Sequence, residues 1–320
     1  MSNALHRIEV PASAQPERVD KLLVDVLALS RARAKKLFDD GAVRINGKRV
    51  RKGVMALPGD VVEVSLSPEA ERVPSQVAPE PQPELQLRIA FEDSAMVVLD
   101  KPPGMPSHPL DPGEHGTAAN FLAARFPECL GANPAAPREA GLVHRLDTDT
   151  SGLLAAARTP EAHAALRAAF TARAVDKRYL AAVSGPLGDE GEIELPVAHA
   201  PGDARKMVAL GSESEATRLK ARPARTSFRV LERKGDASLL EVRIDTGVMH
   251  QIRVHLSAIG APILGDALYG GPASPGLSRH FLHAARLGFQ SPAGDLPAER
   301  RAIEVQSALP EDLDQAWRAL

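Results

Sequence analysis

A proline-rich stretch divides the chain into two unequal parts and constrains the fold more than any other feature of the sequence. Residues 68–83 carry three glutamates, no apolar periodicity, and Pro68, Pro74, Pro79, Pro81 and Pro83. Closely spaced prolines remove backbone donors and favour an extended, semi-rigid chain. We therefore predict a linker over residues 67–85, between a small domain over residues 15–66 and a large domain over residues 86–320. A long surface loop within one domain is the alternative.

The small segment has the pattern of a compact α/β unit. Apolar residues recur at helical spacing over residues 19–27, and Ser30 can cap a second helix over residues 31–40, which Gly41 ends. Val43 and Ile45 lead into the pair Asn46-Gly47, which is typical of a tight hairpin. Residues 58–60 predict another turn, and residues 61–66 alternate as a last strand.

Positive charge is concentrated in this small segment. Residues 31–52 hold nine Lys or Arg and two Asp, a local excess of +7, whereas the whole chain has a net charge of −2. Such a density of cations neutralises phosphates and favours binding to RNA or DNA with little sequence preference. A merely solvated helix face is the alternative. The candidate RNA-binding side chains are Arg31, Arg33, Lys35, Lys36, Arg44 and Lys48.

The large segment alternates short apolar runs with helical patterns. Strands are expected over residues 89–91, 97–99, 153–157, 179–183, 228–231 and 239–244, and helices over residues 117–126, 160–174, 250–259 and 309–320. Strand runs outnumber long helices, so an α+β fold with a mixed or antiparallel sheet is favoured over a doubly wound fold.

Several classes of protein are excluded by what the chain lacks. Cys129 is the sole cysteine, which rules out an internal disulfide or a thiolate cluster and fits a reducing compartment. The first residues do not have the pattern of a signal peptide, and no apolar run approaches about 18 residues. Phosphate-binding and dinucleotide-binding glycine loops are missing from the sequence. We expect a cytoplasmic monomer without a membrane span, a metal or a cofactor.

Two segments place polar side chains among apolar ones, over residues 141–154 and 245–255. In the first, a polar loop centred on Asp147 lies between Leu142-Val143 and Leu153-Leu154, which we interpret as buried strands. Asp147 is a candidate nucleophile, base or metal ligand, and a simple Asx turn is the alternative. Arg145 can pair with a phosphate or with Asp147, Asp149 is a second candidate carboxylate, and His144 fits a satisfied, partly buried histidine.

The second segment carries His250 and Arg253, which lie three residues apart and so share a face of the expected helix. Arg253 can place a permanent cation beside Asp147, which keeps that carboxylate ionised and oriented. An ordinary ion pair without a catalytic role is the alternative.

The small segment resembles the S4 RNA-binding domain. The likeness covers about 50 residues and lies in the order of a helix, an SRxxAxxL-type helix, a GxVxxNG-type hairpin and a PGD turn. It implies that the second helix and the hairpin hold structured RNA.

The large segment is similar to the pseudouridine synthases of the large-subunit ribosomal RNA type, the RluA-like family. LVHRLDTDTSGLL matches the family signature, and further ordered blocks include FEDSAMVVLDKPPGMPSHP, KRYLAAVSG, TGVMHQIRVHLSAIGAPILGDALYG and HFLHAARLGFQSP. These blocks cover nearly all of residues 86–291. The resemblance implies isomerisation of uridine to pseudouridine in structured RNA, most of all 23S-type ribosomal RNA, without a cofactor.

The resemblance also implies roles for single residues. Asp147 matches the catalytic aspartate that attacks the target nucleotide, and Tyr179 matches the tyrosine that stacks on the uracil and helps to remove a proton. Arg253 matches the basic partner of the aspartate. Arg145 matches the arginine that fills the gap left by the flipped nucleotide, since the base has to leave its stack before the reaction.

One departure from the family pattern stands beside this site. Val248-Met249 replaces the arginine and small hydroxyl residue of the usual TGRTHQIR or TGRSHQLR segment. This change motivates an alternative, a non-catalytic RNA chaperone or ribosome-assembly factor. An RNA hydrolase that uses Asp147 and Asp149 with a metal is a third hypothesis.

Overall fold

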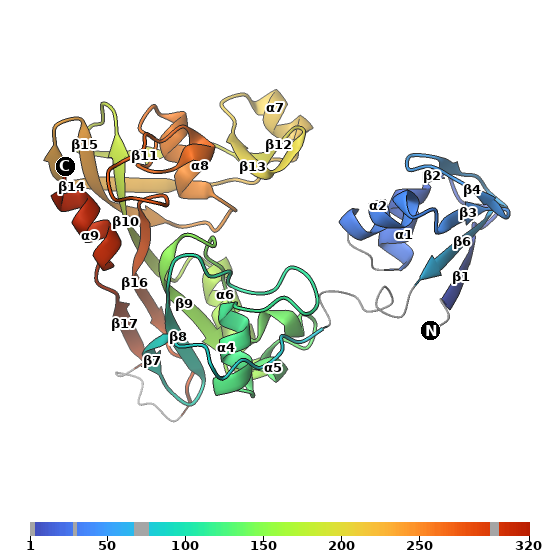
Figure 1. Ribbon diagram of the computed structural model, residues 1–320, viewed down its shortest axis with the longest axis horizontal. Coiled ribbons are helices and arrows are strands. Elements are labelled where there is room, and N and C mark those ends of the chain that lie inside the picture. The colour runs from blue at the N-terminus through green and yellow to red at the C-terminus, as the bar shows by residue number, and fades with distance from the viewer. Residues whose placement is uncertain (1–3, 28–30, 67–76, 295–300) are drawn as a thin grey trace. The chain divides into compact units, whose positions relative to one another are not determined.

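The computed structural model describes residues 4–27, 31–66, 77–294 and 301–320 (Figure 1). The chain groups into two compact units, residues 1–77 with 110–112 and residues 78–109 with 113–320. Within the described ranges, no helix has the length and apolar content needed to span a bilayer. Each unit has its own hydrophobic core and is considered by itself.

The first unit contains the helices and strands expected from its sequence. Helices α1 (Val19–Val26) and α2 (Arg31–Asp39) accompany a sheet of order β1-β6-β3-β4, formed by β1 (Ala4–Glu9), β6 (Val61–Leu66), β3 (Val43–Ile45) and β4 (Lys48–Arg49). A second pair consists of β2 (Glu17–Arg18) and β5 (Met55–Ala56). Val19, Leu23 and Val62 are fully buried in the core. The cap predicted at Ser30 lies outside the described residues.

The second unit is built on a mixed sheet, which confirms the predicted α+β class. Its strand order is β11-β14-β15-β10-β16-β9-β8-β7, and β17 pairs with β16 on a branch. The strands are β7 (Arg88–Glu92), β8 (Met96–Lys101), β9 (Ser151–Ala157), β10 (Asp176–Ser184), β11 (Glu190–Ile193), β14 (Thr226–Lys234), β15 (Ala237–Ile244), β16 (Leu282–Gln290) and β17 (Ala302–Gln306). β9 and β16 run parallel, whereas the neighbouring pairs β8–β9 and β10–β16 are antiparallel.

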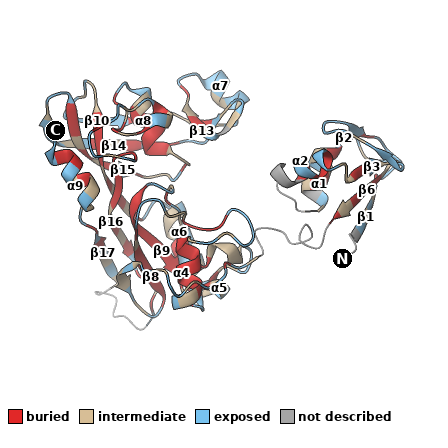
Figure 2. Ribbon diagram, in the orientation of Figure 1, coloured by how far each residue is buried: buried red, intermediate tan, exposed pale blue. Residues whose placement is uncertain are grey.

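Helices and one small hairpin surround this sheet. They are α4 (Ala118–Arg125), α5 (Cys129–Ala132), α6 (Pro160–Thr171), α7 (Glu213–Arg218), α8 (Gln251–Ala258), α9 (Glu311–Arg318), the 3-10 turns η2 (Pro137–Glu139) and η3 (Ala267–Tyr269), and the hairpin β12 (Val197–Ala200) with β13 (Asp203–Ala209). Figure 2 shows buried residues along β9, β10 and β16 and on α4, while α7 is largely exposed.

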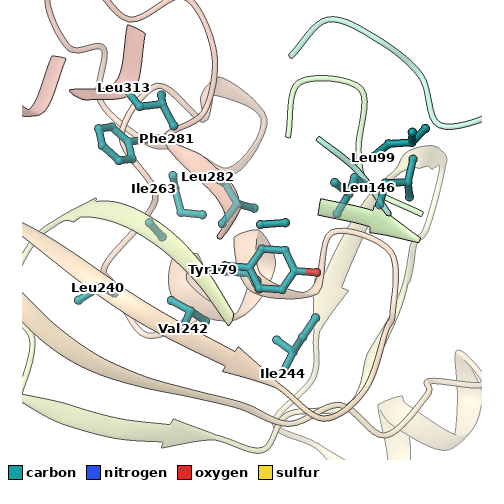
Figure 3. Packing of buried hydrophobic residues seen from close by; sticks show 14 of the residues in the cluster. Leu99, Leu146, Tyr179, Leu240, Val242, Ile244, Ile263, Phe281, Leu282 and Leu313 are labelled. Carbon is teal, nitrogen blue, oxygen red and sulfur yellow. The ribbon is translucent and has the colours of Figure 1, made fainter. Parts of the chain in front are cut away.

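The register of three strands brings distant segments of the chain together. Tyr179 of β10 is opposite Ala284 of β16, and Ala284 is opposite Gly152 of β9. Gly152 has a φ of 111°, and a Cβ atom at this position would lie 2.3 Å from the carbonyl oxygen of Ala284. Only glycine therefore allows β9 to approach β16 here. Figure 3 shows Tyr179 packed among Leu146, Ile244 and Leu282, with Leu146 supplied by the loop before β9.

The structure corrects one predicted strand and adds others. Leu142 and Val143 are buried as expected, but they do not form a strand: Leu142 makes an isolated bridge to Ala156. β1, β11, β16, β17 and the β12–β13 hairpin were not predicted. In the second half of the proline-rich stretch, the carbonyl of Glu80 accepts from Asn120 of α4, and the amide of Gln82 donates to the carbonyl of Asn120. This part of the stretch is hydrogen-bonded to the second unit.

Candidate active site

The loop that carries Asp147 is held by hydrogen bonds from three separate parts of the second unit. Ser107 Oγ donates to the carbonyl of Leu146 at 2.9 Å and accepts from its amide at 3.0 Å. Lys101 Nζ donates to the carbonyl of Thr148 at 3.0 Å. Arg279 donates to the carbonyl of Asp149 at 2.9 Å. The backbone on both sides of Asp147 is therefore fixed, which preorganises its carboxylate.

Lys101 is buried to an unusual degree for a lysine, with 1% of its surface exposed. Its ammonium donates to the carbonyls of Pro102, Met105 and Thr148 at 2.9, 2.8 and 3.0 Å, which accounts for all three of its N–H groups. Burial and the charge of Arg279 lower the pKa of Lys101 to about 7, while the charges of Asp147 and Asp149 oppose the shift. Lys101 thus connects the end of β8 to the Asp147 loop.

Arg253 lies between two carboxylates. Its Nη1 donates to Asp147 Oδ2 at 3.0 Å, and its Nε and Nη2 donate to Asp266 at 2.7 and 2.9 Å. The side chain of Asp266 is 1% exposed and that of Asp147 is 20% exposed. Burial opposes the charge of Arg253, but the hydrogen bonds and charges of Asp266 and Asp147 raise its pKa above the ordinary value. The structure thus places Arg253, a permanent cation, 3.0 Å from Asp147.

His250 approaches the same carboxylate from the beginning of α8. It precedes the helix, with a φ of 54°, so the expected helix begins one residue later. His250 Nε2 is 3.7 Å from Asp147 Oδ2, and Nδ1 is 2.9 Å from the hydroxyl of Tyr269. Burial lowers the pKa of His250 despite the opposing charge of Asp147. A neutral imidazole therefore lies beside the Asp147–Arg253 pair.

Tyr179 and Arg145 complete the group of predicted residues. A pocket of about 730 Å³ is lined by Asp147, Tyr179, Arg253 and Arg145, together with His250. Burial and the nearby charge of Asp147 raise the pKa of Tyr179, which keeps its phenol neutral. Arg145 is exposed and forms no ion pair with Asp147 among the described residues. The pocket thus offers one carboxylate, one aromatic ring and several cations to a ligand.

His144 and a candidate metal site are two further features that the sequence analysis raised. His144 Nε2 accepts from the amide of Ala155 at 3.0 Å, and its ring stacks on Phe170 at a centroid distance of 5.0 Å. Burial, with the charges of Lys177 and Arg167, lowers the pKa of His144 to about 3, so it is a satisfied structural histidine as expected. In the described part of the chain, no group of three or more His, Cys, Asp or Glu side chains is arranged to hold a metal ion.

Known proteins match this chain over both units. The sequence profile of the RNA pseudouridylate synthase family matches residues 95–258, and that of the S4 domain matches residues 17–62. An uncharacterized RNA pseudouridine synthase of Chloroflexus aurantiacus is 38% identical over 315 residues, which are 98% of this chain and 93% of that protein. The chain belongs to the RNA pseudouridine synthase family.

Two further comparisons support this assignment. The ribosomal large subunit pseudouridine synthase D of Xanthomonas campestris pv. campestris is 34% identical over 334 residues, covering 100% of this synthase and 94% of that protein. The solved structure of human RNA pseudouridylate synthase domain containing 4 is 26% identical, with a TM-score of 0.53, and covers 72% of this synthase and 91% of that chain. This protein is therefore an enzyme with an S4 domain at its N-terminal end.

Several residues that build the site of the synthase were missed in the sequence. Asp266 lies within a block that resembles the family, but nothing local shows that it pairs with Arg253, thirteen residues away. Gln251 is a second example: it accepts from the amide of Val248 and donates to the carbonyl of Arg225, which closes the turn before α8. Both residues act through partners that only the folded chain brings near.

The unusual Val248-Met249 pair of the synthase has a packing role. Val248 is buried with Val197 of β12, Met207 of β13 and Tyr269, and Met249 packs against the same cluster. These apolar contacts join the β12–β13 hairpin to α8, next to Asp147. Val248 and Met249 therefore make hydrophobic contacts at the pocket wall, where the family pattern has an arginine and a small hydroxyl residue.

The basic residues of the S4 domain are arranged as surface cations. Lys35 and Lys36 on α2, Arg44 on β3 and Lys48 on β4 are all exposed. Arg49 differs, because it donates to the carbonyls of Asp40 and Gly41 at 2.9 Å and so closes the end of α2. The side chains of Arg31 and Arg33 lie outside the described part of the structure.

Proposed function

We propose that this synthase converts specific uridines of structured large-subunit ribosomal RNA to pseudouridine, in the cytoplasm and as a monomer. The relative from Xanthomonas campestris is named for the large ribosomal subunit. In this chain an S4 domain precedes the catalytic unit. The exposed cations of that domain and the cations around the pocket suit a polyanionic ligand.

The reaction breaks the bond between N1 of uracil and C1′ of ribose, turns the base and joins C5 to C1′. C5 loses its proton and N1 gains one, so the product has the same atoms and no redox partner is required. The target base has to leave its stack to reach the pocket, and the planar cation of Arg145 can occupy the space that it leaves. Asp147 acts on the ribose, either by attack at C1′ or through a glycal route.

The other residues of the pocket support this step. Tyr179 presents a neutral, buried ring for stacking on the uracil. Arg253 donates a hydrogen bond to Asp147 and so holds its carboxylate in position at the pocket. The observation that carries the proposal is the meeting of Asp147, Arg253 and Tyr179, from three elements distant in sequence, in one pocket.

A substitution of Asp147 tests the proposal directly. We expect Asp147→Asn to abolish pseudouridine formation on ribosomal RNA, while RNA affinity changes by less than about three-fold, because the pocket cations remain. Asp149→Asn is the matched control, since it removes the same charge from an exposed position of the same loop. Turnover by the Asp147 variant would refute the assignment.

The target uridine can be found in a strain that lacks the gene. Carbodiimide-based mapping of its ribosomal RNA should show one or more pseudouridines missing, and the wild-type gene should restore them while the Asp147→Asn gene should not. If every pseudouridine persisted, the alternative of a non-catalytic assembly factor, which the Val248-Met249 pair motivates, would be favoured.

A further inference from the structure

Three arginines at the pocket differ from most others of the same unit, because they lack an acidic partner within the described residues. Arg145, Arg173 and Arg222 line the pocket and are exposed, and within the described residues none of them has a carboxylate within 4.0 Å. Most exposed arginines elsewhere on the unit are paired with a carboxylate: Arg229 is 3.3 Å from Glu241, and Arg233 is 2.8 Å from Asp189. Uncompensated cations around a concave surface focus a positive potential there.

The pocket wall as a whole is positive. Its cationic lining residues are Arg145, Arg167, Arg173, Lys177, Arg222 and Arg253, and its acidic ones are Glu139, Asp147 and Asp245. Asp147 and Arg253 satisfy each other, and Asp245 lies 3.6 Å from Arg243. A cation surplus therefore remains around the site, although the whole chain carries a net charge of −2.

Arg173 holds a backbone position that arginine rarely occupies. It follows the C-cap of α6 with a φ of 58°, and its amide donates to the carbonyl of Phe170 while the amide of Ala174 donates to that of Ala169. This is a Schellman ending, in which glycine is the preferred residue. The left-handed conformation is unfavourable for a residue with a Cβ atom, which meets the following carbonyl oxygen. An exposed cation is therefore kept at the pocket where the backbone favours glycine.

We propose that Arg173 and Arg222 form a phosphate-binding site, which holds the backbone of the RNA strand that flanks the target uridine. Arg173 approaches from the end of α6, and Arg222 from the segment between α7 and β14. A guanidinium binds phosphate oxygens through two parallel N–H donors, so each arginine suits one phosphate. The inference rests on the proposed function, because it assigns part of the same RNA to these two residues.

The salt dependence of RNA binding tests this site. The probe is a synthetic RNA stem-loop with uridines in its loop, because phosphate contacts are largely independent of sequence. Each lost contact to a single strand should reduce the slope of log K against log salt by about 0.7, which corresponds to about five-fold weaker binding at about 0.1 M salt. We expect this from Arg173→Gly and from Arg222→Gln, and about twice the change in slope from both together.

The variants are chosen so that misfolding cannot imitate the result. Arg173→Gly removes the cation but installs the residue that this backbone favours, so thermal stability should be retained. Arg229→Gln is the matched control, since it removes the same charge from a position whose arginine is paired with Glu241. An unchanged slope in the Arg173 and Arg222 variants would overturn the proposal, as would an equal change in the Arg229 control.

The outcome is separable from that of the proposed function. Binding slopes are measured without turnover, whereas pseudouridine formation is tested through Asp147. Unchanged slopes beside an inactive Asp147→Asn enzyme would overturn the phosphate site alone. Turnover by Asp147→Asn would overturn the proposed function. The phosphate site would still be tested by the salt slopes of the Arg173 and Arg222 variants.

Discussion

Asp147 depends on a side chain that it does not touch. Asp266 takes two of the donors of Arg253 at 2.7 and 2.9 Å and leaves Nη1 directed at Asp147. The face of the guanidinium also lies over the ring of Tyr269, 5.1 Å from its centroid. Arg253 is therefore fixed in direction by its surroundings, and we expect Asp266 to act as a positioning residue for the proposed reaction.

Replacing Asp266 should therefore affect catalysis more than RNA binding. We expect Asp266→Asn to lower kcat by about 10- to 100-fold through a small displacement of Arg253, with KM nearly unchanged. The unfolding free energy should fall by about 3 kcal/mol, because a buried ion pair loses one partner. Asp189→Asn, on the exposed pair with Arg233, is the control and should cost less than about 1 kcal/mol. Wild-type kcat in the Asp266 variant would contradict this role.

At the scale of elements, the last helix is connected to the catalytic loop through Arg279. The guanidinium, 6% exposed, donates to Asp312 of α9 at 2.7 and 3.1 Å, to the carbonyl of Asp149 at 2.9 Å and to Ser151 Oγ at 3.2 Å. α9 also contributes Trp317, whose ring packs edge-on against Phe281. The final segment thus supports the loop of Asp147 through Arg279, which contacts both α9 and the carbonyl of Asp149.

This connection predicts that a change at Asp312 affects the reaction that we assign to Asp147. Asp312→Asn should lower kcat by about ten-fold and the unfolding free energy by about 1–3 kcal/mol, since Arg279 loses its ionic partner. Asp314→Asn serves as the control on the same helix, because its pair with Arg318 is exposed and such pairs contribute about 0.3–0.5 kcal/mol. Equal kinetics of the two variants would argue against the connection.

The same loop confers a dependence of stability on pH through His280. His280 Nε2 is 2.8 Å from Thr150 Oγ1, and burial, followed by the charge of Arg253, lowers its pKa to about 4, although three carboxylates oppose the shift. As the pH falls, the unfolded chain takes up this proton first, near pH 6.5. The stabilisation is therefore complete above about pH 6.5 and is lost progressively towards about pH 4.

We expect the urea midpoint of the wild type to fall between about pH 6.5 and about pH 5, before most carboxylates titrate. His280→Gln should have a flatter profile over that range, with a residual slope from other buried histidines such as His144. A profile parallel to that of the wild type would show that His280 does not titrate in this way.

On the scale of the whole molecule, each of the two compact units carries cations that we propose to contact RNA. Lys35, Arg44 and Lys48 are exposed on the first unit, and Arg44 of β3 is paired in register with Arg49 of β4. Cations of this kind contact phosphates and contribute affinity that is largely independent of sequence. The second unit holds the pocket in which we place the chemistry.

Neutralising these surface cations should weaken RNA binding without changing the chemical step. The triple variant Lys35→Gln, Arg44→Gln and Lys48→Gln should reduce the salt slope by about two units on ribosomal RNA and leave kcat at saturating RNA unchanged. Arg49→Gln is a contrasting variant, because its contacts to the end of α2 predict a loss of stability in the first unit. An unchanged slope in the triple variant would mean that this surface contacts no RNA.

Local patterns were sufficient for most elements of the fold. α1, α2, β6, α4 and α8 were predicted within a few residues, because each has an amphipathic period or a strong end signal such as Gly41. Leu142-Val143 misled because a short buried run looks the same whether it pairs with a strand or bends into a loop. The central strand β16 went unpredicted, because its pattern is broken by Arg286 and Gly288.

For the site, the sequence alone determined which residue types were available: a carboxylate at position 147, a phenol at 179, a cation at 253, and a basic segment before a proline-rich stretch. The expected chemistry came from the resemblance of the surrounding ordered blocks to the pseudouridine synthases. Only the tertiary structure decided what holds them, since Asp266, Arg279, Lys101 and the contact of Gly152 with Ala284 involve partners that no local pattern relates to them. Such partners are chosen by strand register and packing, and neither is written in any short stretch of the chain.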